Sequence, residues 1–313
     1  MLESKSLKSS ALNSSELLVS ISSLELRSAT FMSKESTVEE VMKSLRDGAL
    51  GSILIGNDNN LEGVITERDF LFKISLEYDE VKNSPIEKFM TTNPYSLSSE
   101  DSIIDVISLM CNKEFRHIPV RFDGSFKIIS VTDLISFFLG HFSEELERHG
   151  TKIKWSRDGV YLQEFVHYDD SEVQDDAINS RIFETPLRKI MFRDALHCSA
   201  KNTLRDAIIS LRESKKGSAL IMSFETELKG IISERDLLRK VYGQVDIDKE
   251  KVEDFMTEDP HKLLEQDLIA VAINNMSKYK YRSVIVANQG GYPISIVSIL
   301  DILKYMSSKF KTE

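Results

Sequence analysis

The sequence predicts an α/β (α+β) protein made of four β-α-β-β-α units with small sheets flanked by helices. The stretch GVITERD, Gly63 to Asp69, returns as GIISERD, Gly230 to Asp236. Four polar helix starts recur along the chain, and each is followed by two short β-rich runs and another helix start. Self-similarity of this kind indicates a repeated supersecondary unit.

Each unit contains an amphipathic helix with a polar, cap-forming start. The four segments are SKESTVEEVMKSL from Ser33, SSEDSIIDVISLM from Ser98, SAKNTLRDAIISL from Ser199 and LEQDLIAVAINNM from Leu264. Ser, Thr, Asp and Asn are favoured there because they accept a bond from the first free backbone N–H groups. The equivalent positions are separated by 65, 101 and 65 residues: Thr37, Ser102, Thr203 and Leu268.

Two apolar runs and a closing helix complete each unit. The first runs are GSILIG, RHIPVR, GSALIM and RSVIVA, from Gly51, Arg116, Gly217 and Arg282. The second runs are EGVIT, KIIS, KGIIS and SIVS, and the closing helices open around Asp69, Asp133, Asp236 and Asp301. The period thus changes from helical to extended and back within one unit.

A unit of about 60 residues buries too little surface to be stable alone, so the units are expected to pair. The linkers SPIEKFMTTNP and KVEDFMTEDP join the first unit to the second and the third to the fourth. We therefore predict the following division: a flexible tail at 1–24, module 1 at 25–142 (units about 25–78 and 84–142), a connector at 143–185, and module 2 at 186–308 (units about 186–243 and 250–308).

Composition indicates a globular protein that is expected to be cytoplasmic. A formal charge of −10 argues against nucleic acid or an anionic membrane as the partner of the chain as a whole. No apolar run approaches the roughly 18 residues that would span a membrane. Cys111 and Cys198 lie in apolar contexts without a ligand cluster, which favours two inert thiols in a reducing compartment. The sequence offers no metal-binding motif.

Four copies in register, with both M-T-x-x-P linkers, the h-I-P-V-type strand and the terminal G-h-h-[ST]-x-x-D, resemble the cystathionine-beta-synthase (CBS) domain. Members of that family occur in pairs called Bateman modules. The resemblance covers about three quarters of the chain, and it implies a regulatory fold whose clefts bind AMP, ADP, ATP, S-adenosylmethionine or a related nucleotide. It implies a regulatory ligand and no required cofactor.

The resemblance also implies which residues would hold the ligand. In the family the Asp of the terminal motif binds ribose hydroxyls and the nearby Ser or Thr helps to hold ribose or phosphate. The matching pairs are Thr66 with Asp69, Ser130 with Asp133, Ser233 with Asp236, and Ser298 with Asp301. Lys127 and Ser295 replace the motif glycine in the second and fourth units, whose pairs are therefore the weaker candidates.

The residues themselves support two interpretations of this motif. An Asp in the first turn of a helix is a fixed acceptor suited to ribose hydroxyls, and the helix start favours phosphate. Ser/Thr-x-x-Asp is equally a plain capping arrangement. Arg68 and Arg235, directly before Asp69 and Asp236, are not needed for a cap, so in the first and third units we favour ligand binding.

The units also alternate. The first and third carry Gly-Ser at the first strand and Arg before the Asp, whereas the second and fourth carry Arg116 and Arg282 at that strand. If each module has a pseudo-two-fold axis, Arg116 and His117 could join Arg68 at one phosphate, and Arg282 could join Arg235. This hypothesis predicts that Asp69→Ala and Asp236→Ala weaken nucleotide binding and that Asp133→Ala and Asp301→Ala do little.

The function expected from these features is a non-catalytic sensor that binds a nucleotide and signals to a protein effector by module rearrangement. The alternative is a ligand-free scaffold that dimerises or docks a partner. No nucleophile and base converge in the sequence, so we predict neither catalytic residues nor an enzyme. The two modules could form an intramolecular four-unit disc, or each could pair with a second chain as a homodimer.

Overall fold

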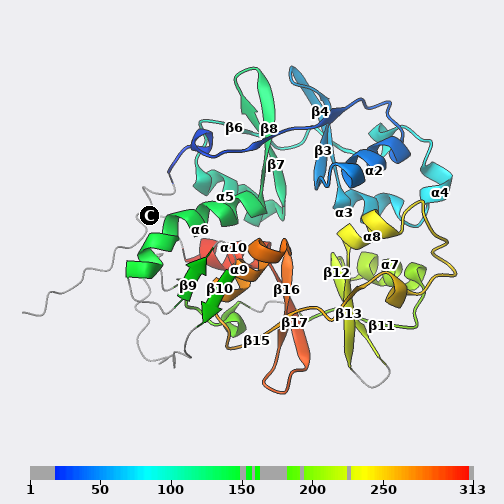
Figure 1. Cartoon of the computed structure of the whole chain (residues 1–313). Coiled ribbons are helices and arrows are strands. Elements are labelled where there is room, and N and C mark those ends of the chain that lie inside the picture. The colour runs from blue at the N-terminus through cyan, green and yellow to red at the C-terminus, as the bar shows by residue number, and fades with distance from the viewer. Residues whose placement is uncertain are drawn as a thin grey trace, which may run out of the picture.

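The computed structural model describes residues 18–148, 153–156, 159–162, 182–190, 194–223 and 227–309. Each predicted unit forms a small sheet flanked by helices, and the four units surround a common centre (Figure 1). The predicted α+β class is therefore confirmed. The described helices include none that is long and apolar enough to cross a membrane.

Module 1 consists of two similar halves. The first unit contains β2 (Phe31–Met32), α2 (Val38–Asp47), β3 (Ser52–Asn57), β4 (Asn60–Thr66), α3 (Glu67–Asp69), the π-helical turn η2 (Phe70–Ile74), α4 (Tyr78–Val81), η3 (Ile86–Lys88) and β5 (Thr91–Thr92). The second unit contains β6 (Leu97–Ser98), α5 (Ile103–Lys113), β7 (His117–Phe122), β8 (Ser125–Ser130) and α6 (Val131–Arg148).

Module 2 repeats the plan. The third unit contains β11 (His197–Ser199), α7 (Leu204–Glu213), β12 (Ser218–Met222), β13 (Leu228–Ser233), α8 (Glu234–Lys240), η6 (Val252–Asp254) and β14 (Thr257–Glu258). The fourth contains η5 (Leu187–Lys189), β15 (Lys262–Leu264), α9 (Ile269–Tyr279), β16 (Ser283–Ala287), β17 (Pro293–Ser298) and α10 (Ile299–Ser308). In every unit a short parallel strand precedes an antiparallel hairpin.

The first helix of each unit begins where the sequence predicts. Thr37, Ser102 and Thr203 are the N-caps of α2, α5 and α7, and each forms a capping box with an acidic residue three positions later. Two free N–H groups are thereby satisfied in each case. Leu268 occupies the same place before α9 and makes no side-chain cap.

The start of the chain is more ordered than predicted. Residues 1–17 of the predicted tail lie outside the described residues, but Ile21–Ser23 form a 3-10 turn, η1, in which Ile21 is fully buried. The strand β1 (Arg27–Ser28) then pairs with β8 of the second unit. A flexible tail reaching residue 24 is therefore wrong, because an apolar side chain within the Ser-rich sequence anchors it to the second unit.

The predicted connector contains regular structure in its described part. The helix α6 extends to Arg148, and β9 (Ile153–Ser156) pairs with β10 (Gly159–Leu162) in an antiparallel hairpin. Strand β9 contacts α6 and β10 contacts α9, so this hairpin lies against helices of both modules (Figure 1).

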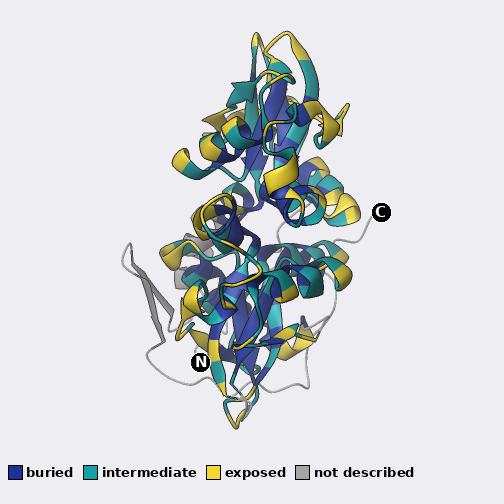
Figure 2. Cartoon of the chain, turned by 90° about the vertical axis from the view of Figure 1, so that its right-hand side faces the viewer, coloured by how far each residue is buried: buried dark blue, intermediate teal, exposed yellow. Residues whose placement is uncertain are grey.

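Both large hydrophobic cores are shared between the modules. One combines buried residues of the first and third units, including Phe70, Ile208 and Tyr242. The other combines the second and fourth units, including Ile107, Phe138 and Ile302. The helices meet accordingly: α2 and α3 contact α8, whereas α10 contacts α5 and α6. Buried residues lie in the sheets and on the helix faces turned inward (Figure 2). The chain thus forms the intramolecular disc that the sequence left as one alternative.

Candidate functional site

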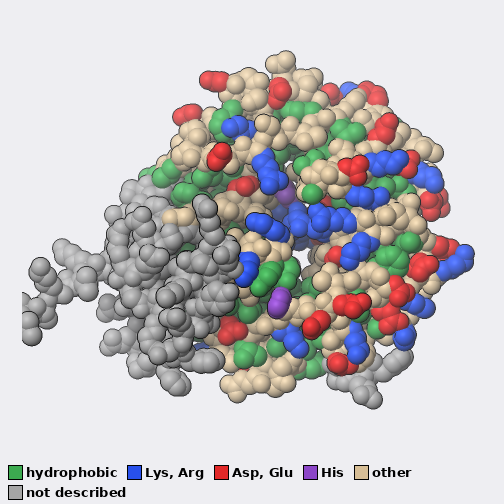
Figure 3. Space-filling view, in the orientation of Figure 1, with side chains coloured by type: hydrophobic (Ala, Val, Ile, Leu, Met, Phe, Trp, Pro, Cys, Tyr) green, Lys and Arg blue, Asp and Glu red, His purple; other side chains and the backbone are tan. Residues whose placement is uncertain are grey.

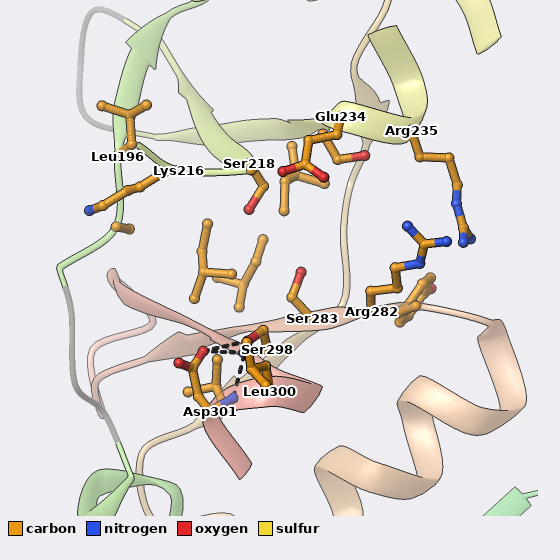
Figure 4. A pocket seen from close by; sticks show the side chains of 18 of the residues that line it. Leu196, Lys216, Ser218, Glu234, Arg235, Arg282, Ser283, Ser298, Leu300 and Asp301 are labelled. Carbon is orange, nitrogen blue, oxygen red and sulfur yellow. Dashed lines mark hydrogen bonds between the residues drawn. The ribbon is translucent and has the colours of Figure 1, made fainter. Parts of the chain in front are cut away.

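A cavity of about 330 Å³ opens between the third and fourth units (Figure 4). Strands β12 and β13 and the start of α8 form one wall, and β16, β17 and the start of α10 form the other. Ser233 and Asp236 line the first wall, and Ser298 and Asp301 line the second. The structure therefore places the two predicted pairs of module 2 in one cavity. The predicted pairs of module 1 do not line this cavity: Thr66, Asp69, Ser130 and Asp133.

All four Ser/Thr-x-x-Asp pairs form capping boxes. Asp236 Oδ2 accepts hydrogen bonds from the backbone N–H of Ser233 at 3.0 Å and from its hydroxyl at 2.5 Å. The pairs at Thr66, Ser130 and Ser298 have the same arrangement. The capping interpretation is thus correct as far as Oδ2 is concerned.

The second carboxylate oxygen of each Asp distinguishes the copies. Asp69 Oδ1 lies 2.7 Å from Lys73 Nζ, a close ion pair. Asp236 Oδ1 has only long contacts, at 3.5 Å to both Lys240 Nζ and Thr257 Oγ1. Asp301 Oδ1 has no hydrogen-bond partner among the described residues. In the cavity of module 2, both carboxylates can therefore accept another hydrogen bond while they cap their helices.

Two buried glutamates at the centre of the molecule collect the predicted arginines. Glu234, whose side chain is 3% exposed, lies 2.8 Å from Arg116 Nη1 and 3.1 Å from Arg68 Nη1. Glu67, at 4%, pairs with Arg282 and lies 3.5 Å from Arg235 Nε. The two clusters have the same plan. Each joins a glutamate of one module to two arginines of the other module, one from each of its units.

The arginines meet in the predicted pairs. Arg68 with Arg116, and Arg235 with Arg282, each converge on a glutamate of the opposite module. Arg235 and Arg282 also line the cavity between their own two units. The sequence motif of one module does not predict the contacts with the glutamates, because they form only when the two modules pack against each other. The His117 ring lies against Gly51 beside Arg282.

Glu67 and Glu234 are buried, ion-paired residues of the site that the sequence motifs did not single out. They occupy the same position in GVITERD and GIISERD, where the second and fourth units have Val131 and Ile299. A buried carboxylate is costly unless it is paired. The signal available in the sequence was thus an acidic residue placed directly before the motif arginine in the first and third units only.

The glycines that open the first strands make room for these clusters. A Cβ on Gly217 would overlap Glu234 Oε1 and lie 3.0 Å from Arg116 Nη2, and a Cβ on Gly51 would overlap the His117 ring and lie 2.8 Å from Arg282 Nη2. The glycines of the first and third units therefore leave space for the arginines at the equivalent strand position of the fourth and second units.

The cavity is basic at its inner end. Eight Lys and Arg residues line it against five Asp and Glu residues. Figure 3 shows Lys and Arg side chains gathered around a hollow in the middle of the face. Arg235 Nε has no hydrogen-bond partner in the described structure, and the guanidiniums of Arg235 and Arg282 are turned toward each other (Figure 4). Converging cations with incomplete pairing favour an anion.

Apolar side chains form much of the remaining lining. Leu196, Ile231, Ile285, Ile296 and Leu300 contribute to the walls, and Tyr281 lies beside them. A pocket with mostly apolar walls and a few convergent polar groups is typical of small-molecule sites. The arrangement can accommodate a flat apolar ring, a group of hydroxyls and an anionic tail within one cavity.

The CBS domain family model matches residues 22–76, 86–140, 187–243 and 252–308. The chain belongs to the CBS domain family. The CBS domain-containing protein CBSCBSPB1 of Arabidopsis thaliana is 22% identical over 285 residues, covering 89% of this chain and 52% of the relative. This CBS protein therefore spans about half the length of the curated relatives it matches.

Solved structures show the same fold. Protein MJ1225 of Methanocaldococcus jannaschii superposes with a TM-score of 0.68 at 15% identity, covering 90% of this chain and 98% of its own. A conserved protein of Pyrococcus horikoshii gives a TM-score of 0.53 at 17% identity and covers 91% and 98% of the two chains. The arrangement of all four CBS units is therefore shared with these archaeal proteins.

We expect Gly217→Ala to lower the free energy of unfolding by about 1–3 kcal/mol, since the new methyl group must push the buried Glu234–Arg116 pair apart. Urea unfolding measures the change. Gly140→Ala is the matched control, because a Cβ there meets nothing within 4 Å and alanine favours the helix. Equal stability of Gly217→Ala and the wild type would contradict the steric account.

We expect His117 to make the stability of the protein depend on pH. Burial, with Arg282, Arg116 and Arg235 nearby, holds the pKa of its imidazole well below the usual value. Below about pH 6.5 the unfolded chain therefore binds a proton that the folded chain does not, and stability falls by at most about 1.4 kcal/mol per pH unit. Thermal unfolding between pH 7.5 and 5.5 should show this loss, and His117→Gln should reduce it. An identical pH slope in the variant would contradict the assignment.

Proposed function

We propose that this CBS protein is a non-catalytic regulatory sensor that binds an adenosine-type nucleotide between its third and fourth units. The observation that supports the proposal is that the Asp236 and Asp301 carboxylates, apolar walls and an excess of cations lie together in one cavity. Its volume of about 330 Å³ lies within the range typical of small-molecule sites.

Each part of an adenosine nucleotide has a matching group in the cavity. The ribose hydroxyls would donate to Asp236 Oδ1, whose existing contacts are long. The purine would lie between apolar residues such as Ile231 and Ile296, and the phosphate would face Arg235 and Arg282. Guanidinium groups bind phosphate oxygens through paired N–H donors, which suits them to this role.

The position of the cavity suggests how binding would become a signal. Arg68 of the first unit and Arg116 of the second unit line a cavity built mainly by the third and fourth. A ligand there would contact residues of all four units and so favour one packing of the modules over another. A protein effector that recognises that packing would read the signal.

Relatives are consistent with this role. MJ1225, which has the same fold, is described as a candidate archaeal homologue of g-AMPK. This similarity concerns the fold alone, so the proposal of a nucleotide ligand depends on the residues that line the cavity of this chain.

The competing function is a ligand-free scaffold. It is favoured by the capping boxes, because every motif Asp already has a structural task. A scaffold has no use for a second, weakly engaged carboxylate oxygen beside Arg235, and this is why we prefer the sensor.

Calorimetric titration with AMP, ADP, ATP and S-adenosylmethionine tests the proposal. We expect binding by at least one of them, and Asp236→Asn should weaken it about tenfold or more, because an amide keeps the helix cap and replaces the ribose acceptor with a donor. Asp133→Asn is the matched control, since Asp133 forms the same cap outside the cavity. No binding by the wild type would favour the scaffold. Binding with equal affinity in both variants would contradict the role of Asp236 as the ribose acceptor.

A further inference from the structure

Glu234 occupies the inner end of the cavity, where its carboxylate engages cations that face the same space. It lines the cavity together with Arg68 and Arg116, and it binds both of these guanidiniums. Its side chain is 3% exposed, and the Gly217 backbone lies directly behind Oε1. The carboxylate is therefore held in place rather than free to swing into solvent.

A carboxylate and a phosphate compete for the same arginine donors. Both present oxygens that match the guanidinium fork, and a negative charge a few ångströms from a second one repels it strongly in a partly dry site. Arg68 and Arg116 can serve a ligand phosphate fully only if Glu234 gives them up. Arg235 differs, because its Nε has no hydrogen-bond partner and its contact with Glu67 is 3.5 Å long.

Resting on the proposed function, we propose that Glu234 is a specificity-determining residue that competes with ligand phosphates for Arg68 and Arg116. A first phosphate finds Arg235 and Arg282. Each additional negative charge meets the Glu234 carboxylate, so the cavity discriminates between ligands by the charge of their tails.

The same competition couples ligand charge to the packing of the modules. Glu234 belongs to the third unit, whereas Arg68 and Arg116 belong to the first and second. A tail charged enough to take these arginines therefore breaks the ion pairs that join module 2 to module 1. A neutral tail leaves them intact.

The test compares adenosine, AMP, ATP and inorganic pyrophosphate in calorimetric titrations of the full chain. In Glu234→Gln we expect affinity to rise about tenfold or more for ATP and pyrophosphate, less for AMP, and not at all for adenosine. Glu77→Gln is the matched control: Glu77 also pairs across the modules, with Arg212 at 3.4 Å, but neither residue lines the cavity. That control should bind all four as the wild type does.

The outcomes separate this inference from the proposed function. If AMP binds the wild type but Glu234→Gln leaves every affinity unchanged or weakens phosphate binding, the inference fails and the function stands. If adenosine and AMP do not bind, while pyrophosphate binds Glu234→Gln more tightly than the wild type, the proposed function fails and the inference about Glu234 stands. Binding of none of the four to any variant overturns both.

Loss of the buried carboxylate could unfold the variant, so a second substitution keeps the test decisive. Glu67→Gln releases Arg235 and Arg282, which also line the cavity, through the pseudo-symmetric cluster. It should tighten pyrophosphate binding in the same direction, and unchanged or weaker binding in a folded Glu67→Gln would contradict the competition.

Discussion

The packing of the protein depends on two hydrophobic cores that each join one unit of module 1 to one unit of module 2. A single unit has an apolar helix face that it cannot cover, and the chain covers it with the equivalent unit of the other module. This arrangement brings the starts of α3 and α8 together at the centre. It therefore decides which charged residues meet there, although none of those residues contributes to the cores.

The central charges are a consequence of that arrangement. Burying Glu67 and Glu234 without partners would be strongly unfavourable, and the four arginines offset this cost. The glutamates are fewer than the arginines, so positive charge remains at the inner end of the cavity. The same residues thus pair across the two modules and leave positive charge beside the cavity. Under the proposed function, this would link the bound nucleotide to how the modules pack.

Local features of the fold could be predicted from the sequence, and contacts between distant units could not. Thr37, Ser102 and Thr203 mark helix starts because capping is a local interaction, and the strand starts at Ser52, His117, Ser218 and Ser283 follow from periodicity. The motif residues Asp236 and Asp301 were likewise visible. Glu67 and Glu234 were missed because their role appears only when two units 167 residues apart in sequence meet.

The central claim is that a nucleotide binds in the cavity between the third and fourth CBS units. A crystal structure of the chain grown with AMP tests it most directly. We predict a nucleotide with its ribose on Asp236, its base between Ile231 and Ile296, and its phosphate at Arg235 and Arg282. An empty cavity at saturating AMP, or a nucleotide bound only elsewhere on the protein, would contradict the account.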